Sequence, residues 1–334
     1  MTTAAAAPVL TVRNLVVSYG TPKGMLAAVD GVDFELHPGE SLGLVGESGC
    51  GKSSLGRAIL QLMPIGGRVE GSVRLGDEEL VGANAQRLRH VRGEEVALVF
   101  QEPMTRLDPL LRVSAHFVEA IRAHRPDIDK SEARQMGRTA LAAMGIPPTR
   151  ADNYPHEFSG GMRQRIMIAL GIVLKPRVVI ADEPTTALDV IVEAQILQIL
   201  DRLRSDQQVG LILITHNLGI VAETCDRVAV MYAGKIVEIG TVEQVFAAPK
   251  HPYTQGLLAS TISLETTKLH SIGGVPPDLL VPPPGCRFAP RCPAVMPKCT
   301  AAVPTYAEPA PGQLAACYLY PGADANLQGA VAHR

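Results

Sequence analysis

The segment 46–53 constrains this chain more than any other, because it fits the pattern G-x-x-x-x-G-K-[ST]. It lies after an apolar run at 42–45 and before a helical pattern at 55–62. Glycines let successive backbone N–H groups point at phosphate oxygens, and the helix N-terminus adds positive potential. We therefore expect a nucleoside triphosphate here, with Lys52 on its β- and γ-phosphates and Ser53 on Mg²⁺. The expected binding residues are Gly46, Glu47, Ser48, Gly49, Cys50, Gly51, Lys52, Ser53 and Ser54.

Composition excludes several classes of function. The 334 residues suggest one large domain with an appendage. A net charge of −2 and the absence of Trp argue against a nucleic-acid partner. The longest apolar run, 166–174, is far too short to cross a membrane, and residues 1–7 lack the pattern of a signal peptide. We expect a peripheral protein on the cytoplasmic face of the cell membrane.

Hydrophobic periodicity predicts an α/β chain with an inserted helical block. Asp129 and Glu132 are expected to cap one of the predicted helices. The helical block, at about 106–172, interrupts the α/β core, and a proline-rich segment follows. The expected strands are 9–19, 27–36, 42–45, 73–75, 96–100, 178–181, 211–214, 228–231 and 235–239. The expected helices are 113–124, 131–144, 166–174 and 190–206.

The apolar strand 178–181 ends in the carboxylates of Asp182 and Glu183. At the edge of a parallel sheet, Asp182 can hold Mg²⁺ through water and Glu183 can polarise the water that attacks the γ-phosphate. An Asp-Glu pair alone is more often a solvated strand end. The phosphate loop makes the catalytic interpretation the better one.

A second glycine turn makes the pattern specific. It consists of Ser159, Gly160, Gly161 and Met162, about 20 residues before the acidic strand. With Phe158 before it, the segment resembles the L-S-G-G-Q signature of the ABC-transporter ATPases, with Phe replacing Leu and Met replacing Gln. The resemblance implies a P-loop NTPase (RecA-like) core, an antiparallel β subdomain and a helical subdomain.

Other family positions match in order along residues 9–240. Tyr19 resembles the aromatic residue that stacks on adenine, with a surface strand tyrosine as the alternative. Gln101 resembles the glutamine that contacts Mg²⁺ and senses the membrane partner. Asp189, in Ala187-Leu188-Asp189, matches the D-loop. His216 matches the histidine that contacts the γ-phosphate, although a lone histidine after a strand more often has a structural role.

The resemblance also implies a shared catalytic site. The signature residues of one chain reach the ATP of a second ATPase subunit, so ATP binding closes the pair and hydrolysis opens it. The variant signature resembles the D-type subunit of peptide importers, which implies a heterodimer. It also implies two transmembrane permease subunits and an extracytoplasmic substrate-binding protein. An importer of nickel, glutathione or another small solute, and a soluble ABC ATPase outside transport, are the alternatives.

The C-terminal part carries a cluster of four cysteines, Cys286, Cys292, Cys299 and Cys317, among twelve of the 26 prolines. Such residues predict a loop-rich module that holds a metal or cluster. The text around 251–254 and 273–292 resembles the C-terminal extension of oligopeptide and dipeptide importer ATPases. Some of those carry a [4Fe–4S] cluster, and Zn²⁺ or free thiols are the alternatives. We expect a nucleotide-binding domain at 1–250 and this extension at 251–334.

Cys50 lies inside the phosphate loop. Its simplest role is that of a small filler, because contacts at this position are made by the backbone. A thiol near a helix N-terminus can also have a lowered pKa, in which case alkylation would inhibit and ATP would protect.

Overall fold

The computed structural model describes residues 7–100, 107–186, 188–260 and 271–324. These residues form two compact units. Of the described residues, unit 1 comprises 7–37, 41–82, 213–260 and 271–324, and unit 2 comprises 38–40, 83–100, 107–186 and 188–212. Within the described ranges, no helix combines the length and the apolar character that a membrane span requires.

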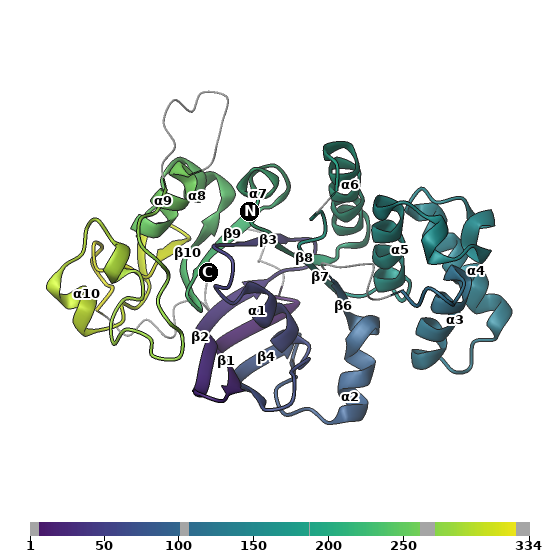
Figure 1. The fold of residues 1–334 in the computed structure, drawn as a ribbon, viewed down its shortest axis with the longest axis horizontal. Coiled ribbons are helices and arrows are strands. Elements are labelled where there is room, and N and C mark those ends of the chain that lie inside the picture. The colour runs from purple at the N-terminus through teal and green to yellow at the C-terminus, as the bar shows by residue number, and fades with distance from the viewer. Residues whose placement is uncertain (1–6, 101–106, 187, 261–270, 325–334) are drawn as a thin grey trace. The chain divides into compact units, whose positions relative to one another are not determined.

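Unit 1 contains an antiparallel sheet with the strand order β2-β1-β4-β5. Figure 1 labels its strands β2, β1 and β4. Alternating apolar residues place one face of the sheet in the core, because Leu10, Val12, Leu15 and Val17 of the first strand are fully buried. Leu10 faces Leu36 on one side and Leu75 on the other. The strands are β1 (Leu10–Thr21), β2 (Gly24–Leu36), β4 (Gly67–Leu75) and β5 (Glu78–Glu79).

A second group of strands in unit 1 has the order β11-β12-β10-β9-β3. Strand β3 runs parallel to β9. Strands β9 and β10 form a tight hairpin through Ala233 and Gly234, which both have positive φ. These strands are β3 (Ser41–Val45), β9 (Arg227–Tyr232), β10 (Lys235–Thr241), β11 (Ala307–Ala310) and β12 (Gln313–Ala315). The helices of unit 1 are α1 (Lys52–Ile59), α7 (Leu218–Thr224), α8 (Val242–Ala247), α9 (Pro252–Ala259) and α10 (Pro297–Ala301).

Unit 2 contains a parallel strand pair and a block of helices. Strand β6 (Val96–Val99) runs beside β7 (Val178–Asp182), and β8 (Gly210–Ile214) begins in this unit and ends in unit 1. Helices α3, α4 and α5 lie side by side (Figure 1). The helices are α2 (Ala85–His90), α3 (Val113–His124), α4 (Lys130–Ala143), α5 (Gly160–Ile172) and α6 (Val190–Gln207), with a distorted turn at Val91–Glu95.

The predicted elements agree with the structure in type and approximate position. Helix α3 has the predicted ends, and Asp129 caps α4 by accepting the backbone N–H groups of Ser131 and Glu132 at 2.6 and 2.9 Å. Several short elements were not predicted from the sequence, among them α2 and the hairpin of β11 and β12. That hairpin adds a strand pair to the edge of β10.

A close helix contact gives a test of packing in unit 2. Gly137 of α4 faces the buried ring of Phe117, and a Cβ at this position would lie 2.6 Å from Phe117 Cγ. We expect Gly137→Ala to destabilise the protein by about 1–2 kcal/mol, because overpacking outweighs the better helix propensity of alanine. Chemical denaturation measures the change. Thr139→Ala, at an exposed position of the same helix, is the control and should change stability by less than about 0.5 kcal/mol.

Candidate nucleotide-binding site

The phosphate loop of unit 1 is fixed by two close backbone contacts. Strand β3 is buried throughout and leads into the loop. A Cβ at Gly46 would lie 2.0 Å from the carbonyl oxygen of Met231, and one at Gly51 would lie 2.2 Å from that of Ala28. Both glycines also have positive φ, of 152° and 108°. Only glycine fits these two positions, so the course of the loop is determined by its neighbours.

Lys52 begins helix α1, and its side chain folds back into the loop. The ammonium group donates to the carbonyl oxygens of Gly46 and Glu47 at 2.8 and 3.1 Å, and the residue is only 6% exposed. Ser53 and Ser54 follow in the first turn, half-buried, while Ser48 and Gly49 are exposed. The expected phosphate-binding residues therefore lie together on one loop and the helix that follows it.

Burial determines the chemistry of Cys50. The residue is 5% exposed, and its Sγ lies 3.7 Å from Lys52 Nζ. Burial raises the pKa of the Cys50 thiol, and this outweighs the attraction of Lys52. The hypothesis of a lowered pKa is therefore wrong. A buried filler agrees with the structure.

His216 and Tyr19 also belong to unit 1. The backbone N–H of Thr215 donates to the carbonyl of Leu44 at 3.2 Å, so the exposed His216 follows a strand that ends beside the start of the phosphate loop. Half-buried Tyr19 pairs with Leu26 of β2, the strand that passes the loop at Ala28. Gln101 lies outside the described residues.

The acidic pair lies at the end of β7 in unit 2. Asp182 is 4% exposed, and Glu183 is half-buried with a left-handed φ of 48°. The carboxylate of Glu183 accepts the hydroxyl of Thr186 at 2.8 Å. A positive φ is rare for a residue with a side chain, and here the conformation turns the chain directly after the strand.

The signature turn and the D-loop cap two neighbouring helices of unit 2. Ser159 Oγ accepts the N–H of Met162 at 3.4 Å at the start of α5. Asp189 accepts the N–H of Val192 at 3.0 Å at the start of α6. A Cβ at Gly161 would lie 2.4 Å from Val192, whereas Gly160 has open space around its Cα. One glycine thus permits helix packing, and the other leaves backbone accessible.

The four cysteines of the extension line one cavity of about 10 Å³ together with Phe288. Backbone N–H groups face three of the sulfurs, from Phe288 and Ala289 to Cys286, from Ala294 to Cys292, and from Leu319 to Cys317. Burial raises the pKa of the Cys317 thiol to about 11. Four thiols with directed N–H groups suit a metal in their chemistry. However, no three His, Cys, Asp or Glu side chains in the described ranges form a metal-binding arrangement. The expected cluster is therefore not supported by the structure.

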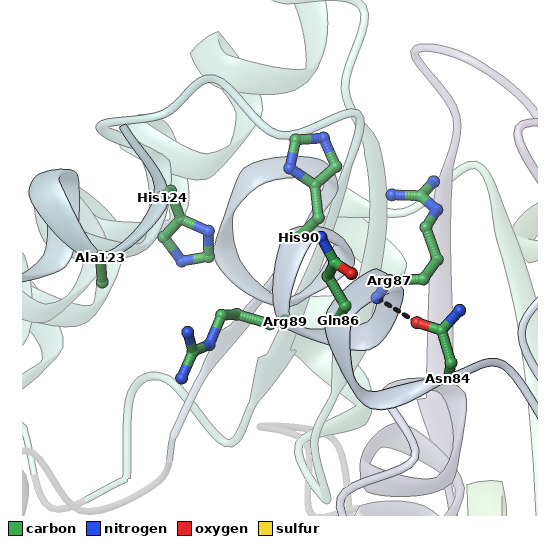
Figure 2. Close-up of a pocket in the computed structure, with 7 residues that line it drawn as sticks. All are labelled: Asn84, Gln86, Arg87, Arg89, His90, Ala123 and His124. Carbon is green, nitrogen blue, oxygen red and sulfur yellow. Dashed lines mark hydrogen bonds between the residues drawn. The ribbon is translucent and has the colours of Figure 1, made fainter. Parts of the chain in front are cut away.

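Unit 2 also has a pocket of about 390 Å³ that sequence analysis did not anticipate. Figure 2 shows side chains of α2 on one side and His124 of α3 on the other. Among its basic side chains, Arg87 forms an ion pair with Glu95, His90 Nδ1 lies 2.8 Å from a carboxylate oxygen of Glu94, and Arg89 also lines the pocket.

Two residues that contact the phosphate loop were not predicted from the sequence. Arg291 forms an ion pair with Glu47, and the Tyr253 hydroxyl accepts the N–H of Glu47 at 2.9 Å. Both come from the extension, more than 200 positions further along the chain. Nothing in the sequence around Arg291 or Tyr253 marks either residue as a partner of this loop.

Comparison with known proteins defines the family. The family model "ABC transporter" matches residues 29–186, and "Oligopeptide/dipeptide transporter, C-terminal region" matches residues 237–299. The dipeptide transport ATP-binding protein DppD of Bacillus subtilis is 46% identical over 89% of this chain and 90% of its own. The oligopeptide transport ATP-binding protein OppD of Escherichia coli is 43% identical over 92% of each chain.

Solved structures agree with this fold. A dimeric ATP-binding cassette bound to ADP and phosphate superposes with a TM-score of 0.63 at 24% identity, covering 70% of this chain and 98% of its own. The cassette cbiO1 of Clostridium perfringens gives 0.61 at 27% identity, covering 72% and 92%. The fold and motifs define an ATP-binding cassette. The chain belongs to the ABC-transporter ATPases, in the branch with the oligopeptide/dipeptide transporter C-terminal region, and it is an ATPase of that family.

The buried thiol of Cys50 gives a second test. We expect alkylation of Cys50 in the folded protein to be at least about tenfold slower than in the denatured chain, because the thiol is both inaccessible and protonated near neutral pH. The alkylation rate of a thiol rises with pH as the thiolate forms. Because the pKa of Cys50 is raised, we expect this rise at a higher pH than for an ordinary thiol. Mass spectrometry after timed iodoacetamide treatment measures each site. The half-buried Cys225 is the internal control, and faster labelling of Cys50 than of Cys225 would contradict the assignment.

Proposed function

We propose that this chain is the ATP-binding and hydrolysing subunit that powers a bacterial importer of oligopeptides or dipeptides. The observation that carries the proposal is the combination of a complete ATPase motif set with a C-terminal region of the peptide-transporter type in one chain. Its relatives, more than 40% identical over most of their length, are named as dipeptide and oligopeptide transport ATP-binding proteins. We propose a nucleotide-binding domain at 1–250, with its helical part at about 106–172, and an extension at 251–334.

The proposed roles follow the chemistry of phosphoryl transfer. Lys52 binds the β- and γ-phosphates, and backbone N–H groups of the phosphate loop hold their oxygens. Ser53, Asp182 and Gln101 hold Mg²⁺, which neutralises charge on the phosphates. Glu183 polarises the attacking water, His216 contacts the γ-phosphate, and Tyr19 stacks on adenine.

A second ATPase subunit completes the proposed site. Ser159 and Gly160 lie at the N-terminus of α5, where backbone N–H groups suit an anion. We propose that they contact ATP bound by the partner, together with Gly161, Met162 and Asp189. ATP then holds two cassettes together, and loss of the γ-phosphate releases them. The pair, proposed as a heterodimer, acts peripherally on the cytoplasmic face of the membrane with two permease subunits and a binding protein.

Removal of the catalytic carboxylate tests this mechanism. We expect Glu183→Gln to lower the ATP hydrolysis rate of the transporter by about 10²–10⁴-fold while ATP binding persists, because the amide cannot act as a base. The variant should also trap an ATP-bound closed pair. Phosphate release and size-exclusion chromatography measure the two effects. Hydrolysis at the wild-type rate would contradict the role of Glu183.

Uptake by cells tests the proposed substrate. In a strain that lacks this chain, uptake of labelled dipeptides and oligopeptides should fall and return with the wild-type chain but not with Glu183→Gln. Glu223→Gln, at an exposed position of α7, is the matched control and should restore uptake. Unchanged peptide uptake with loss of nickel or glutathione uptake would favour the alternative solutes. No transport defect at all would favour an ABC ATPase outside transport.

We further propose that the four cysteines bind a [4Fe–4S] cluster, with Zn²⁺ as the alternative. The proposal rests on the chemistry of four thiols that line one cavity, although the described side chains form no metal-binding arrangement. The residues would then link separate parts of the extension covalently through the bound group.

Anaerobic purification tests the cysteine group. We expect iron and acid-labile sulfide in stoichiometric amounts, lost in Cys299→Ser and retained in the control Cys225→Ser. The loss should also lower the melting temperature by several degrees, because a bound group stabilises the folded state. Stoichiometric zinc without iron would favour the alternative. Neither metal in anaerobic protein would contradict both.

A further inference from the structure

Two side chains of the extension hold one residue of the phosphate loop. The guanidinium group of Arg291 donates to both carboxylate oxygens of Glu47, at 2.8 and 3.0 Å. The hydroxyl of Tyr253 accepts the backbone N–H of the same residue at 2.9 Å. Glu47 directly follows the glycine that opens the loop. The extension therefore contacts both the side chain and the backbone of Glu47, in the first turn of the phosphate loop.

The ion pair is built into the structure and is not a chance surface contact. The side chain of Arg291 is 5% exposed and that of Glu47 27%. Arg291 also donates to the carbonyls of Gly273 at 2.8 Å and Ile272 at 3.1 Å, and to the hydroxyl of Tyr232 at 3.2 Å. The hydrogen bond to Glu47 is the main cause that raises the pKa of Arg291, so the cation is fully charged. Bidentate Arg–carboxylate pairs are among the strongest and most directional ion pairs in proteins.

The aromatic side chains behind the pair fix the tyrosine. The rings of Tyr232 and Tyr253 have centroids 4.5 Å apart, and Phe288 contacts them at 5.2 and 5.4 Å. Tyr253 is completely buried, so its hydroxyl has a defined position at the loop. The guanidinium of Arg291 lies 5.7 Å from the centroid of Tyr232. Both contacts to Glu47 thus come from one packed cluster.

The negative charge of Glu47 gives a reason for its ion pair with Arg291. A carboxylate within the phosphate loop would repel a polyphosphate, since like charges at close range disfavour each other. Lys52 is the residue proposed to bind the phosphates, and in the structure its ammonium group donates to the carbonyls of Gly46 and Glu47 and not to the Glu47 carboxylate. Arg291 supplies a separate cation, and it turns the Glu47 carboxylate into one half of a neutral pair.

We propose that Arg291 is a positioning residue for the nucleotide: it neutralises and holds Glu47 so that the phosphate loop accepts ATP. The inference rests on the proposed role of this loop in ATP binding. It assigns to the C-terminal extension a direct effect on nucleotide affinity, and it predicts that this effect is electrostatic.

Charge-removal variants of the full-length chain test the proposal. Calorimetry with the Mg²⁺ complex of the non-hydrolysable analogue adenylyl imidodiphosphate measures affinity. We expect Arg291→Met, which keeps the apolar stem, to bind about tenfold more weakly, because Glu47 is then unneutralised. Adding Glu47→Gln to Arg291→Met should restore affinity to within about twofold. In the assembled transporter, Arg291→Met should raise KM for ATP with little change in kcat.

Glu47→Gln alone provides an independent readout in case the arginine variant does not fold. It leaves the cation of Arg291 beside the phosphates, so we expect binding about threefold tighter than wild type. Arg13→Met is the matched control, because it breaks another partly buried Arg–Glu pair in unit 1, with Glu35, and should leave affinity unchanged.

The outcomes separate this inference from the proposed function. A wild-type chain that binds no nucleotide, or a Lys52→Ala variant that binds as well as wild type, would overturn the function of the loop itself. Wild-type binding with equal affinity in Arg291→Met would overturn only the present inference. A double variant as weak as Arg291→Met would also overturn it, because it would show a structural role without a charge effect.

Discussion

The close approach of the phosphate loop to its neighbouring strands is the constraint on which the rest of unit 1 depends. At Gly46 and Gly51 the backbone passes within reach of the carbonyls of Met231 and Ala28, and any Cβ would collide with them. The loop is thereby fixed by main-chain contacts rather than by its own exposed side chains. This rigidity lets backbone N–H groups act as a preorganised anion site, because no reorganisation is needed when charge arrives.

Local patterns predicted much of this molecule because local physics determines those parts. The strand before the loop is a continuous apolar run, and α3 and α6 start where the helical periodicity starts. The phosphate loop, the signature turn and the acidic strand are short segments with a fixed order of residue types. The structure places the phosphate loop before α1, the signature turn at the start of α5 and Asp182 at the end of β7. The roles of these residues in binding and catalysis stay predictions, and Gln101 lies outside the described residues.

Contacts between distant segments were not predictable in the same way. Arg291 and Glu47 are separated by 244 positions, and their pairing follows from the packing of Phe288 against Tyr232 and Tyr253. The pKa of Cys50 was misjudged for a related reason. Its nearness to a helix start is visible in the sequence, but its burial depends on tertiary contacts, and desolvation outweighed the favourable charge of Lys52. The hairpin of β11 and β12 was likewise not predicted, because its short strands lie in a segment rich in prolines.

The extension is integrated into the nucleotide-binding unit through charge as well as packing. Arg287 of the extension pairs with Asp30 at 2.6 Å, and Asp30 also pairs with Lys235 at 3.0 Å. Arg287 lies two residues before the short helical segment Ala289–Arg291, and Arg291 is the last residue of that segment. One basic turn therefore reaches both β2 and the phosphate loop. Because Cys286 and Cys292 directly flank this turn, any rearrangement of the cysteine group would act on the segment that holds Glu47, which gives the extension a short physical route to the nucleotide.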